Sequence, residues 1–280
     1  MMGRVAIVTG AGRGIGREHA LLLAKEGLQV VVNDVDNEPA QEVVDTIVAA
    51  GGKAVANTSS IADWDQAKSL VQQAIDEFGQ LDVVVNNAGI LRDSYLASTE
   101  EAQFDAVIGV HLKGHFAVMH HAAAYWKAES KAGRQPNGAI VNTTSISGTT
   151  MPNPGQTVYG AAKAGIAAMT LVAAMEMERY GVRVNAIAPI ARTRLTLATP
   201  GMGAMFAAEV PEGEFDAFDP SNVAPAVAYL ASEKCPFTGK VFIVQGGAIS
   251  LLEGWTTVGT VETHGPWDPA ELGEQLAAWA

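Results

Sequence analysis

Short runs of β-branched residues alternate with helical windows along most of this 280-residue chain. Several runs are apolar over three or more consecutive residues, which is typical of parallel strands covered on both faces. The alternation therefore predicts an α/β fold built on a doubly wound parallel sheet of about seven strands. The expected strands are Val5–Thr9, Val30–Asn33, Ala54–Asn57, Asp82–Asn86, Ala139–Thr144, Arg183–Ile187 and Val241–Gln245.

No internal repeat or low-complexity linker divides the chain, so we expect residues 1–280 to form one domain. Three segments depart from the alternation. Lys127–Asn137 is polar and is expected to form an exposed loop. The substrate-loop region 190–222 and the C-terminal extension 255–280 are partly apolar, and each could cover a site at the carboxyl edge of the sheet. The expected helices are Gly14–Glu26, Ala40–Ala50, Asp65–Phe78, Phe104–Ala128 and Tyr159–Tyr180.

Charge and cysteine content narrow the class of protein. There are 18 Lys and Arg against 30 Asp and Glu, a net charge of −12, which argues against nucleic acid or an anionic membrane as a partner. The single cysteine, Cys235, excludes an internal disulfide and fits a reducing cytosol. We find no secretory pattern, no uninterrupted apolar stretch of about 18 residues and no metal-binding cluster. These features predict a soluble cytoplasmic protein.

A glycine-rich turn, Thr9-Gly-Ala-Gly-Arg-Gly-Ile-Gly16, follows the first strand and opens a helix. Glycines let the backbone pass close to a pyrophosphate, and the helix N-terminus stabilises its negative charge. No Gly-Lys-Ser/Thr follows, so the turn is not a P-loop. The context predicts dinucleotide binding by a Rossmann-type sheet. The residues expected to contact the dinucleotide are Gly10, Arg13, Gly14, Ile15 and Gly16.

Asp34 ends the second strand, 34 − 16 = 18 residues after the last glycine. A carboxylate at this position can accept hydrogen bonds from the ribose hydroxyls and repels a 2′-phosphate, which favours NAD as the cofactor. Arg13 favours NADP as the cofactor instead, because a cation in the glycine turn could serve NADP. A strand-end aspartate that only caps a turn is the third reading.

Tyr159 and Lys163 are separated by about one helical turn, so their side chains would share a face. A tyrosine pKa is about 10, and a nearby cation favours the phenolate. Such a pair suits the exchange of an alcohol proton. By itself the spacing also fits two surface residues on an amphipathic helix.

Taken together, Thr9–Gly16, Asn86–Gly89, Ser145 and the Tyr159/Lys163 pair resemble the short-chain dehydrogenase/reductase family. The resemblance implies that Tyr159 is the acid/base and that Lys163 binds the nicotinamide ribose and lowers the tyrosine pKa. It also implies that Ser145 hydrogen-bonds the substrate oxygen. Further cofactor contacts implied by the family are Ser60, Ile61, Asn87, Ala88, Gly89, Pro189 and Thr193.

The chain departs from the family pattern at several positions. His111 stands where most members carry an asparagine of a proton relay; it would either pass the proton onward through water or be a core histidine. Ser60 replaces an aspartate that usually meets the adenine, and Ile190 follows Pro189 in place of glycine. The separation 159 − 145 = 14 between serine and tyrosine is one longer than usual.

Within the family, four segments resemble the dehydrogenase region of peroxisomal multifunctional enzyme type 2, which acts on (3R)-hydroxyacyl-CoA thioesters and some hydroxysteroids. His111 is shared with that subgroup. The family also implies a homotetramer, formed by pairing of the long helices between subunits. The segments are Val32–Asp34, Asn87–Asp93, Val110–Gly114 and Gly254-Trp255.

We therefore expect NAD-dependent oxidation of a secondary alcohol that is bulky and apolar near the reacting carbon. A rival is NADPH-dependent reduction of a 3-oxoacyl thioester or ketone, and a second rival is a catalytically silent dinucleotide-binding regulator. Candidate pocket walls are Leu91, Leu195, Leu197, Met202, Met205 and Phe206, and the candidate cations for CoA phosphates are Arg92, Arg192 and Arg194.

Overall fold

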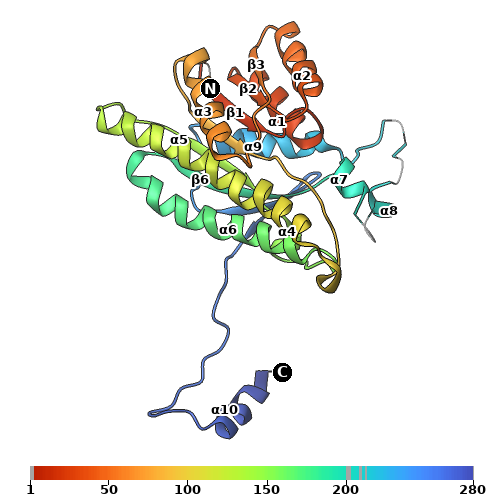
Figure 1. The fold of residues 1–280 in the computed structure, drawn as a ribbon, viewed down its shortest axis with the longest axis vertical. Helices are drawn as coiled ribbons and strands as arrows, with labels where there is room; N and C mark the ends of the chain where they lie inside the picture. The colour runs from red at the N-terminus through yellow and green to blue at the C-terminus, as the bar shows by residue number, and fades with distance from the viewer. Residues whose placement is uncertain (1–2, 200–202, 208–209, 212, 280) are drawn as a thin grey trace.

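An eight-stranded sheet forms the centre of the molecule in a computed structural model that describes residues 3–199, 203–207, 210–211 and 213–279 (Figure 1). Its strand order is β3-β2-β1-β4-β5-β6-β7-β8. Strands β1 to β7 are parallel, whereas β8 is antiparallel to β7. The doubly wound α/β prediction is confirmed, but the antiparallel eighth strand was not expected. The strands are β1 Val5–Thr9, β2 Gln29–Asn33, β3 Lys53–Asn57, β4 Val83–Asn86, β5 Ala139–Thr143, β6 Arg183–Ile190, β7 Val241–Gln245 and β8 Ala248–Leu252.

Helices cover both faces of the sheet, and alternate residues of a central strand enter different helical layers. In β1, Ala6 and Val8 belong to the layer of α1, α2 and α9, while Val5 and Ile7 belong to the layer of α3, α5 and α6. This two-sided burial explains why the strands are continuously apolar. The helices are α1 Gly14–Lys25, α2 Asn37–Ala49, α3 Trp64–Phe78, α4 Glu101–Ile108, α5 Gly114–Lys131, α6 Thr157–Met177 and α9 Ala224–Ala231.

The helix expected at Phe104–Ala128 consists of α4, a π-helical segment Gly109–Lys113 and α5. Because α5 continues to Lys131, the polar loop expected at Lys127–Asn137 begins inside a helix. Trp126 explains the difference, since its buried indole donates a 2.7 Å hydrogen bond to the Leu81 carbonyl. That contact holds the last turns against the sheet while polar residues face outward.

The C-terminal extension does not cover the carboxyl edge of its own sheet. Strand β8 returns antiparallel to β7, so Leu252 pairs with Val241 at the opposite edge. From there the chain leads away from the body to helix α10, Pro269–Leu276 (Figure 1). Trp255 and Val258 in this arm are 94% and 100% exposed. The direction of β8 therefore carries the following segment away from the carboxyl edge of this chain's own sheet.

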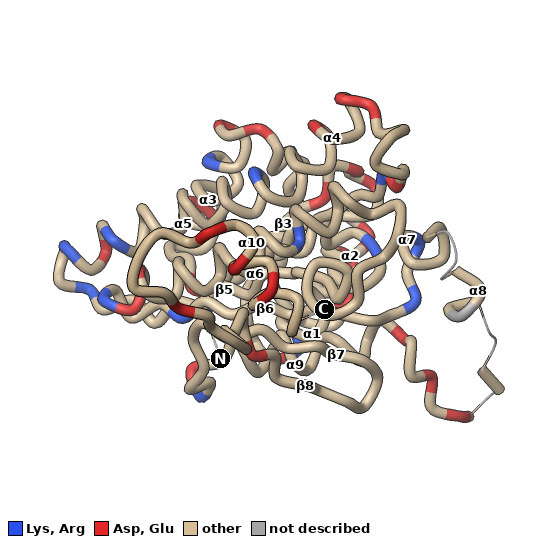
Figure 2. Tube along the Cα trace, turned by 90° about the horizontal axis from the view of Figure 1, so that it is seen from below, with Lys and Arg blue, Asp and Glu red and all other residues tan. Residues whose placement is uncertain are grey.

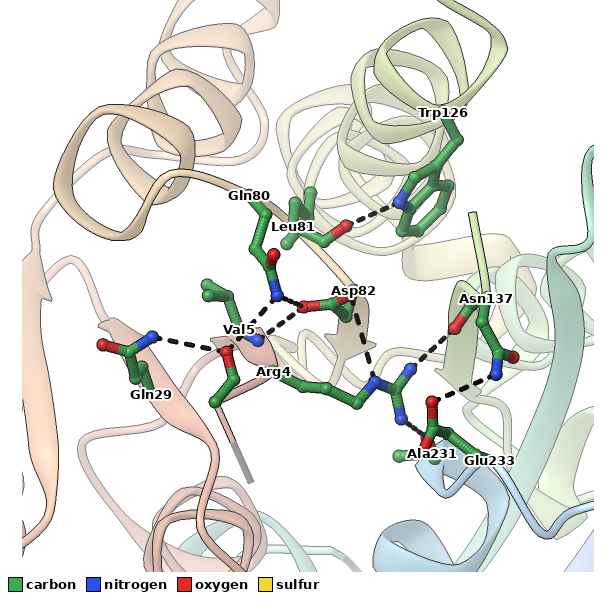
Figure 3. A network of polar contacts seen from close by, with 11 residues as sticks. Arg4, Val5, Gln29, Gln80, Leu81, Asp82, Trp126, Asn137, Ala231 and Glu233 are labelled. Atoms are coloured by element: carbon green, nitrogen blue, oxygen red, sulfur yellow. Dashed lines mark hydrogen bonds and ion pairs between the residues drawn. The ribbon is translucent and has the colours of Figure 1, made fainter. Parts of the chain in front are cut away.

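A polar network ties together the amino edge of the sheet (Figure 3). The buried Arg4 guanidinium donates to the carbonyls of Ala231 at 2.8 Å and Asn137 at 2.7 Å. It also lies 4.0 Å from Asp82, whose carboxylate accepts a hydrogen bond from Val5 N at 2.7 Å. Arg4 thus links the starts of β1 and β4 to the segment before β5 and the end of α9.

Helix α6 with its terminal 3₁₀ turn, Thr157–Tyr180, is long and apolar enough to cross a membrane by length and composition. It carries Tyr159 and Lys163, and it packs against β5, β6 and the π-helical segment. Basic and acidic residues alternate along the trace near the end of α5 (Figure 2).

Candidate active site

The candidate site lies at the carboxyl edge of the sheet, where the strand order reverses between β1 and β4. Ligands of doubly wound sheets bind at this switch point, because the helices that follow the two strands leave on opposite faces. The ends of β1, β4, β5 and β6 bring the predicted glycine turn, asparagines and hydroxyl residues to this edge.

The glycine turn is a compact cradle with an open helix terminus. Gly10 and Gly14 have φ of +62° and +55°, and a Cβ on Gly10 would lie 2.7 Å from Ala88 Cα. A Cβ on Gly16 would collide with the Gly10 carbonyl. Helix α1 begins at Gly14, with Ile15 in its first turn, and its N-cap, Arg13, makes no side-chain capping bond. Its first N–H groups are therefore available to an anion, so the turn fits a dinucleotide pyrophosphate.

Asp34 caps its own turn and also supports the glycine turn. Its Oδ2 accepts a 3.0 Å bond from Gly12 N, and its Oδ1 accepts a 3.1 Å bond from Asp36 N. Each oxygen keeps a further acceptor site, so this capping role and ribose binding are compatible. Arg13 forms a 2.6 Å ion pair with Asp36 at the rim of the site. The arginine is thus already paired with a carboxylate.

The segment after β4 is bonded to the glycine turn. Asn87 Nδ2 donates to the carbonyls of Thr9 and Gly10, both at 3.1 Å, and Thr9 Oγ1 accepts from the backbone of Asn87 and Ala88. Gly89 is required by a close approach, because a Cβ there would meet the His111 ring. The two switch-point strands are therefore locked together at their ends.

The remaining predicted cofactor residues surround this edge. Ser60 donates its backbone N–H to Gln66 Oε1 at 2.8 Å, and Ile61 is buried against Gly114. Pro189 is the penultimate residue of β6 and pairs with Val244 of β7. Thr193 caps the short helix α7, Arg194–Leu197, and lies within van der Waals range of Gly14. The structure thus brings Thr193 to the glycine turn across a long sequence separation.

Tyr159, Lys163 and Ser145 come together as the sequence predicts. The Ser145 side chain lies close enough to the Tyr159 hydroxyl to lower the pKa of the tyrosine, and Ser145 Oγ accepts a 3.1 Å bond from Ser147 N. Lys163 is only 2% exposed, and its Nζ donates a 2.6 Å bond to the Thr143 carbonyl. The Lys163 Nζ lies 5.7 Å from the centroid of the Tyr159 ring. The serine–tyrosine separation of 14 residues does not prevent this contact.

The protonation equilibria differ from the expectation. Burial raises the pKa of Tyr159 to about 12, although the hydrogen bond from Ser145 lowers it, and the charge of Asp93 raises it further. Burial also lowers the pKa of Lys163 to about 7. Burial therefore disfavours the charged form of each group, the tyrosinate and the ammonium, in the chain alone.

His111 lies in the π-helical segment and is 1% exposed. Its Nε2 lies 3.1 Å from Ile90 N and 2.8 Å from Ile90 O, and its tautomer decides which bond forms. Its ring meets the Tyr159 ring edge-on, with centroids 5.2 Å apart. Burial, with the charge of Lys163, lowers the pKa of His111 to about 3, so the imidazole is neutral at physiological pH. Its Nδ1 is buried without a hydrogen-bond partner among the described residues.

The expected pocket walls and cations are only partly assembled. Leu195 and Leu197 are exposed, Leu91 is half-buried and Phe206 is buried. Met202 and the Met205 side chain lie outside the described residues. Arg192 is committed to the substrate-loop region, with a 2.7 Å ion pair to Asp216 and a 2.6 Å bond to the Phe206 carbonyl. Arg92 and Arg194 are exposed.

Two residues beside Tyr159 were not singled out as site residues in the sequence. Gln156, buried three positions before Tyr159, donates a 2.9 Å bond to Asp93 Oδ2 and accepts from Ser147 Oγ at 2.8 Å. Asp93 therefore pairs with Gln156. A glutamine just before the tyrosine was the only local signal, since its partner lies 63 residues away.

Residues 4–198 match the family model described as short chain dehydrogenase. The chain therefore belongs to the short-chain dehydrogenase family, as the motifs suggested. Hydroxyacyl-CoA dehydrogenase ChsB1 of Mycobacterium tuberculosis is 44% identical over 281 residues, covering 97% of this chain and 87% of the relative. The 3-oxoacyl-(acyl-carrier-protein) reductase FabG of Staphylococcus aureus is 39% identical over 250 residues, covering 88% and 98%.

Solved structures give the same assignment. A short chain dehydrogenase from Mycobacterium avium is 52% identical with a TM-score of 0.89, covering 99% of this chain and 94% of that one. A short chain dehydrogenase from Burkholderia cenocepacia, solved in complex with NADP, is 29% identical with a TM-score of 0.77, covering 88% and 98%. The chain is an oxidoreductase of the short-chain dehydrogenase class, with a fold that binds a nicotinamide dinucleotide.

Proposed function

We propose that this chain is an NAD-dependent dehydrogenase that oxidises a secondary alcohol to a ketone, with a (3R)-hydroxyacyl-CoA thioester or a hydroxysteroid as substrate. The observation that carries the proposal is the contact of Ser145 with Tyr159, with Lys163 behind the ring, at the carboxyl edge beside the glycine turn. The relative that dehydrogenates hydroxyacyl-CoA supports the thioester. The narrower resemblance to peroxisomal multifunctional enzyme type 2 remains a prediction.

The dinucleotide would be held by the glycine turn and by residues at neighbouring strand ends. When bound, the nicotinamide ring accepts the hydride of the alcohol carbon. The capping carboxylate of Asp34, together with the Arg13–Asp36 ion pair, supports NAD over NADP, because a 2′-phosphate would meet two carboxylates. The contacts we propose are Gly10, Arg13, Gly14, Ile15, Gly16, Asp34, Ser60, Ile61, Asn87, Ala88, Gly89, Tyr159, Lys163, Pro189 and Thr193.

The protein's own groups would manage the alcohol proton. Ser145 Oγ orients the substrate oxygen, and Tyr159 Oη accepts the proton. Lys163, fixed by the Thr143 carbonyl, retains N–H donors for a ribose hydroxyl and, when protonated, favours the tyrosinate. His111 would pass the proton onward through a change of tautomer, because its low pKa disfavours an imidazolium.

A spectrophotometric screen for NADH formation with hydroxyacyl-CoA and hydroxysteroid panels tests the proposal. Tyr159→Phe removes the titrating hydroxyl with little change of shape and should abolish turnover while leaving NADH binding intact. Near-wild-type turnover in Tyr159→Phe would refute the mechanism. Binding of the cofactor with no reaction across the panel would favour a silent dinucleotide-binding regulator.

The alternative function is NADPH-dependent reduction of a 3-oxoacyl thioester. The similarity to a 3-oxoacyl-carrier reductase and to a structure holding NADP favours this reading. Turnover measured separately with NADH and NADPH distinguishes the two functions. A strong preference for NADPH would mean that Asp34 acts only as a turn cap.

We also propose that the chain assembles as a homotetramer. Helix α6 exposes Leu171, Val172 and Met175, and the edge strand β8 exposes Ile249 and Leu251. Apolar faces of this kind are typical of subunit contacts. Light scattering coupled to size-exclusion chromatography tests the proposal, and a stable monomer would refute it.

A further inference from the structure

Arg192 follows strand β6 and joins three segments of the substrate-loop region. Its guanidinium donates to both carboxylate oxygens of Asp216, at 2.7 and 3.3 Å, and its Nε donates to the Phe206 carbonyl at 2.6 Å. Its backbone N–H donates to the Phe218 carbonyl, also at 2.6 Å. We call these four residues the Arg192 clamp. The clamp holds the outgoing limb of the region, which follows β6, against its returning limb.

The clamp is a packed and partly buried unit. The Arg192 and Asp216 side chains are 29% and 21% exposed. Phe206 is buried, and its ring meets that of Phe218 edge-on with centroids 5.0 Å apart. The Asp216 backbone carbonyl also accepts a 2.7 Å bond from Asn222 Nδ2. A forked guanidinium that bonds both oxygens of a carboxylate and a further carbonyl has a fixed orientation, which an ammonium does not reproduce.

The clamp lies at the carboxyl edge of the sheet, beside the glycine turn. Thr193 follows Arg192 directly, and its methyl group would lie 3.7 Å from a Cβ on Gly14. In the returning limb, Ala217 packs on Gly246, which follows β7, since a Cβ on Gly246 would lie 3.0 Å from the Ala217 carbonyl oxygen. The clamp is therefore seated on the ends of β6 and β7 and reaches the expected cofactor cradle through Thr193.

Helix α7 starts at Arg194, with Thr193 as its N-cap, and Thr193 Oγ1 accepts a 3.1 Å bond from Thr196 N. Helix α7 and the short α8, Gly203–Phe206, project from the body at this edge (Figure 1). A single helical turn is too short to be stable by itself. The segments bonded to α7 therefore set its direction, and the clamp precedes its N-cap. Helix α7 exposes two apolar side chains, Leu195 and Leu197.

We propose that Arg192 is a positioning residue whose clamp directs α7, so that Leu195 and Leu197 form an apolar wall for the acyl chain of a hydroxyacyl-CoA substrate. Arg192 itself touches none of the reacting atoms. The contribution of an apolar wall grows with the length of chain that it covers. Loss of the clamp should therefore weaken the binding of long acyl chains more than that of short ones. The inference rests on the proposed function with a thioester substrate.

The test compares KM and kcat, with NAD+, for (3R)-hydroxybutanoyl-CoA and (3R)-hydroxyhexadecanoyl-CoA. Arg192→Met keeps an apolar stem and removes the guanidinium. KM for the long thioester should rise roughly tenfold and KM for the short one less than about twofold, with kcat nearly unchanged. Arg192→Lys keeps the charge without the fork and should give an intermediate KM. An equal rise of KM for both thioesters, or a fall of kcat alone, would overturn the inference.

A matched control stands at the other end of the same strand. Arg183 begins β6 at the amino edge, and its guanidinium also donates to a backbone carbonyl, that of Leu230, at 3.0 Å. Arg183→Met should therefore lower stability without distinguishing the two thioesters. If its KM depended on chain length as strongly as that of Arg192→Met, any weakening of β6 would suffice and the clamp would have no specific role.

Hydrogen exchange followed by mass spectrometry reads the clamp without turnover. In the presence of NADH, peptides covering residues 192–199 should exchange roughly tenfold faster in Arg192→Met than in wild type, while peptides covering β1 should not change. Unchanged exchange over 192–199 overturns the inference. If wild type oxidises neither thioester, the proposed function fails, and faster exchange still supports the role of the clamp in directing α7.

A second variant keeps the inference testable if Arg192→Met does not fold. Asp216→Asn removes the charge that pairs with Arg192 and keeps the side-chain oxygen that accepts a 2.9 Å bond from Phe218 N. It must show the same two effects, a larger rise of KM for the long thioester and faster exchange over 192–199. The absence of both effects in Asp216→Asn would overturn the inference.

Discussion

The imidazole of His111 stands edge-on to the Tyr159 ring, with centroids 5.2 Å apart and an interplanar angle of 89°. The Nε2 atom of the same imidazole lies within hydrogen-bond distance of both the N–H and the carbonyl of Ile90, in the loop after β4, and its tautomer decides which bond forms. His111 therefore has a structural bond and a place beside the proposed acid/base at once. The two roles predict different consequences of substitution.

We expect His111→Asn to keep most activity, because an amide can both accept from Ile90 N and donate to Ile90 O. His111→Leu removes the hydrogen bond between the imidazole and the Ile90 backbone and should lower the free energy of unfolding by about 1–3 kcal/mol. If the ring also relays the proton, kcat of His111→Ala should fall roughly 10²-fold and recover with added imidazole. Urea unfolding and steady-state kinetics measure the two effects. Unaltered kcat in His111→Ala would leave only the structural role.

The Arg4 network predicts a large effect on stability at the edge opposite the site. Arg4→Met removes the donor to the carbonyls of Ala231 and Asn137, of which the first is buried, and leaves Asp82 without its cation, so the free energy of unfolding should fall by about 2–3 kcal/mol. Arg4→Lys keeps the charge but not the forked geometry and should cost about half as much. The control is Arg17→Met, which removes a partly exposed pair with Glu18 and should change stability by less than about 0.5 kcal/mol.

Features encoded locally were predictable from the sequence. Strands β1 and β7 have the expected bounds, because each is a short β-branched run that is flanked in the sequence by recognisable turns or helices. The glycine turn and the Tyr159–Lys163 spacing are likewise contiguous. Strand β8 was not predicted, since it is almost wholly exposed and follows Gly246 and Gly247 directly.

Features set by long-range packing were not predictable. The Asp93–Gln156 bond joins residues 63 positions apart, and Thr193 reaches Gly14 only through the fold. The depth at which Lys163 is buried also depends on the assembled core, and that burial lowers the pKa of Lys163 to about 7. A sequence motif names the groups of such a site but does not give their solvation.

Three buried histidines predict a loss of stability in acid. Burial lowers the pKa of His19 and of His111 to about 3 and that of His115 well below its usual value. Because the folded-state pKa lies below the unfolded one, the unfolded chain binds each proton first. Their stabilising contribution is therefore complete above about pH 6.5 and declines towards pH 3, at about 1.4 kcal/mol per pH unit for each histidine.

Urea unfolding between pH 7.5 and 5 measures this slope. His19→Leu removes one fully buried imidazole, neither of whose nitrogens has a hydrogen-bond partner among the described residues. The change of the free energy of unfolding with pH should become smaller by the contribution of one histidine. His264→Gln alters an exposed histidine of the C-terminal arm and should leave the slope as it is. An equal slope in wild type and His19→Leu would show that His19 is protonated, or hydrated, in the folded chain.

The contacts of Asp34 and Arg13 predict how cofactor preference can be changed in two independent steps. Asp34→Ser removes the carboxylate that would repel a 2′-phosphate, so the ratio of kcat/KM with NADP+ to that with NAD+ should rise about ten- to a hundredfold. Asp36→Asn releases Arg13 from its 2.6 Å ion pair while Asp34 stays in place, and should raise the ratio by a smaller factor. The double variant should raise the ratio more than either single variant, because repulsion is removed and a free guanidinium is supplied.

Arg13→Ala in the Asp36→Asn background is the control and should cancel the gain. If Asp34→Ser loses stability without any change in the ratio, Asp34 serves the glycine turn alone, and the preference for NAD has another source.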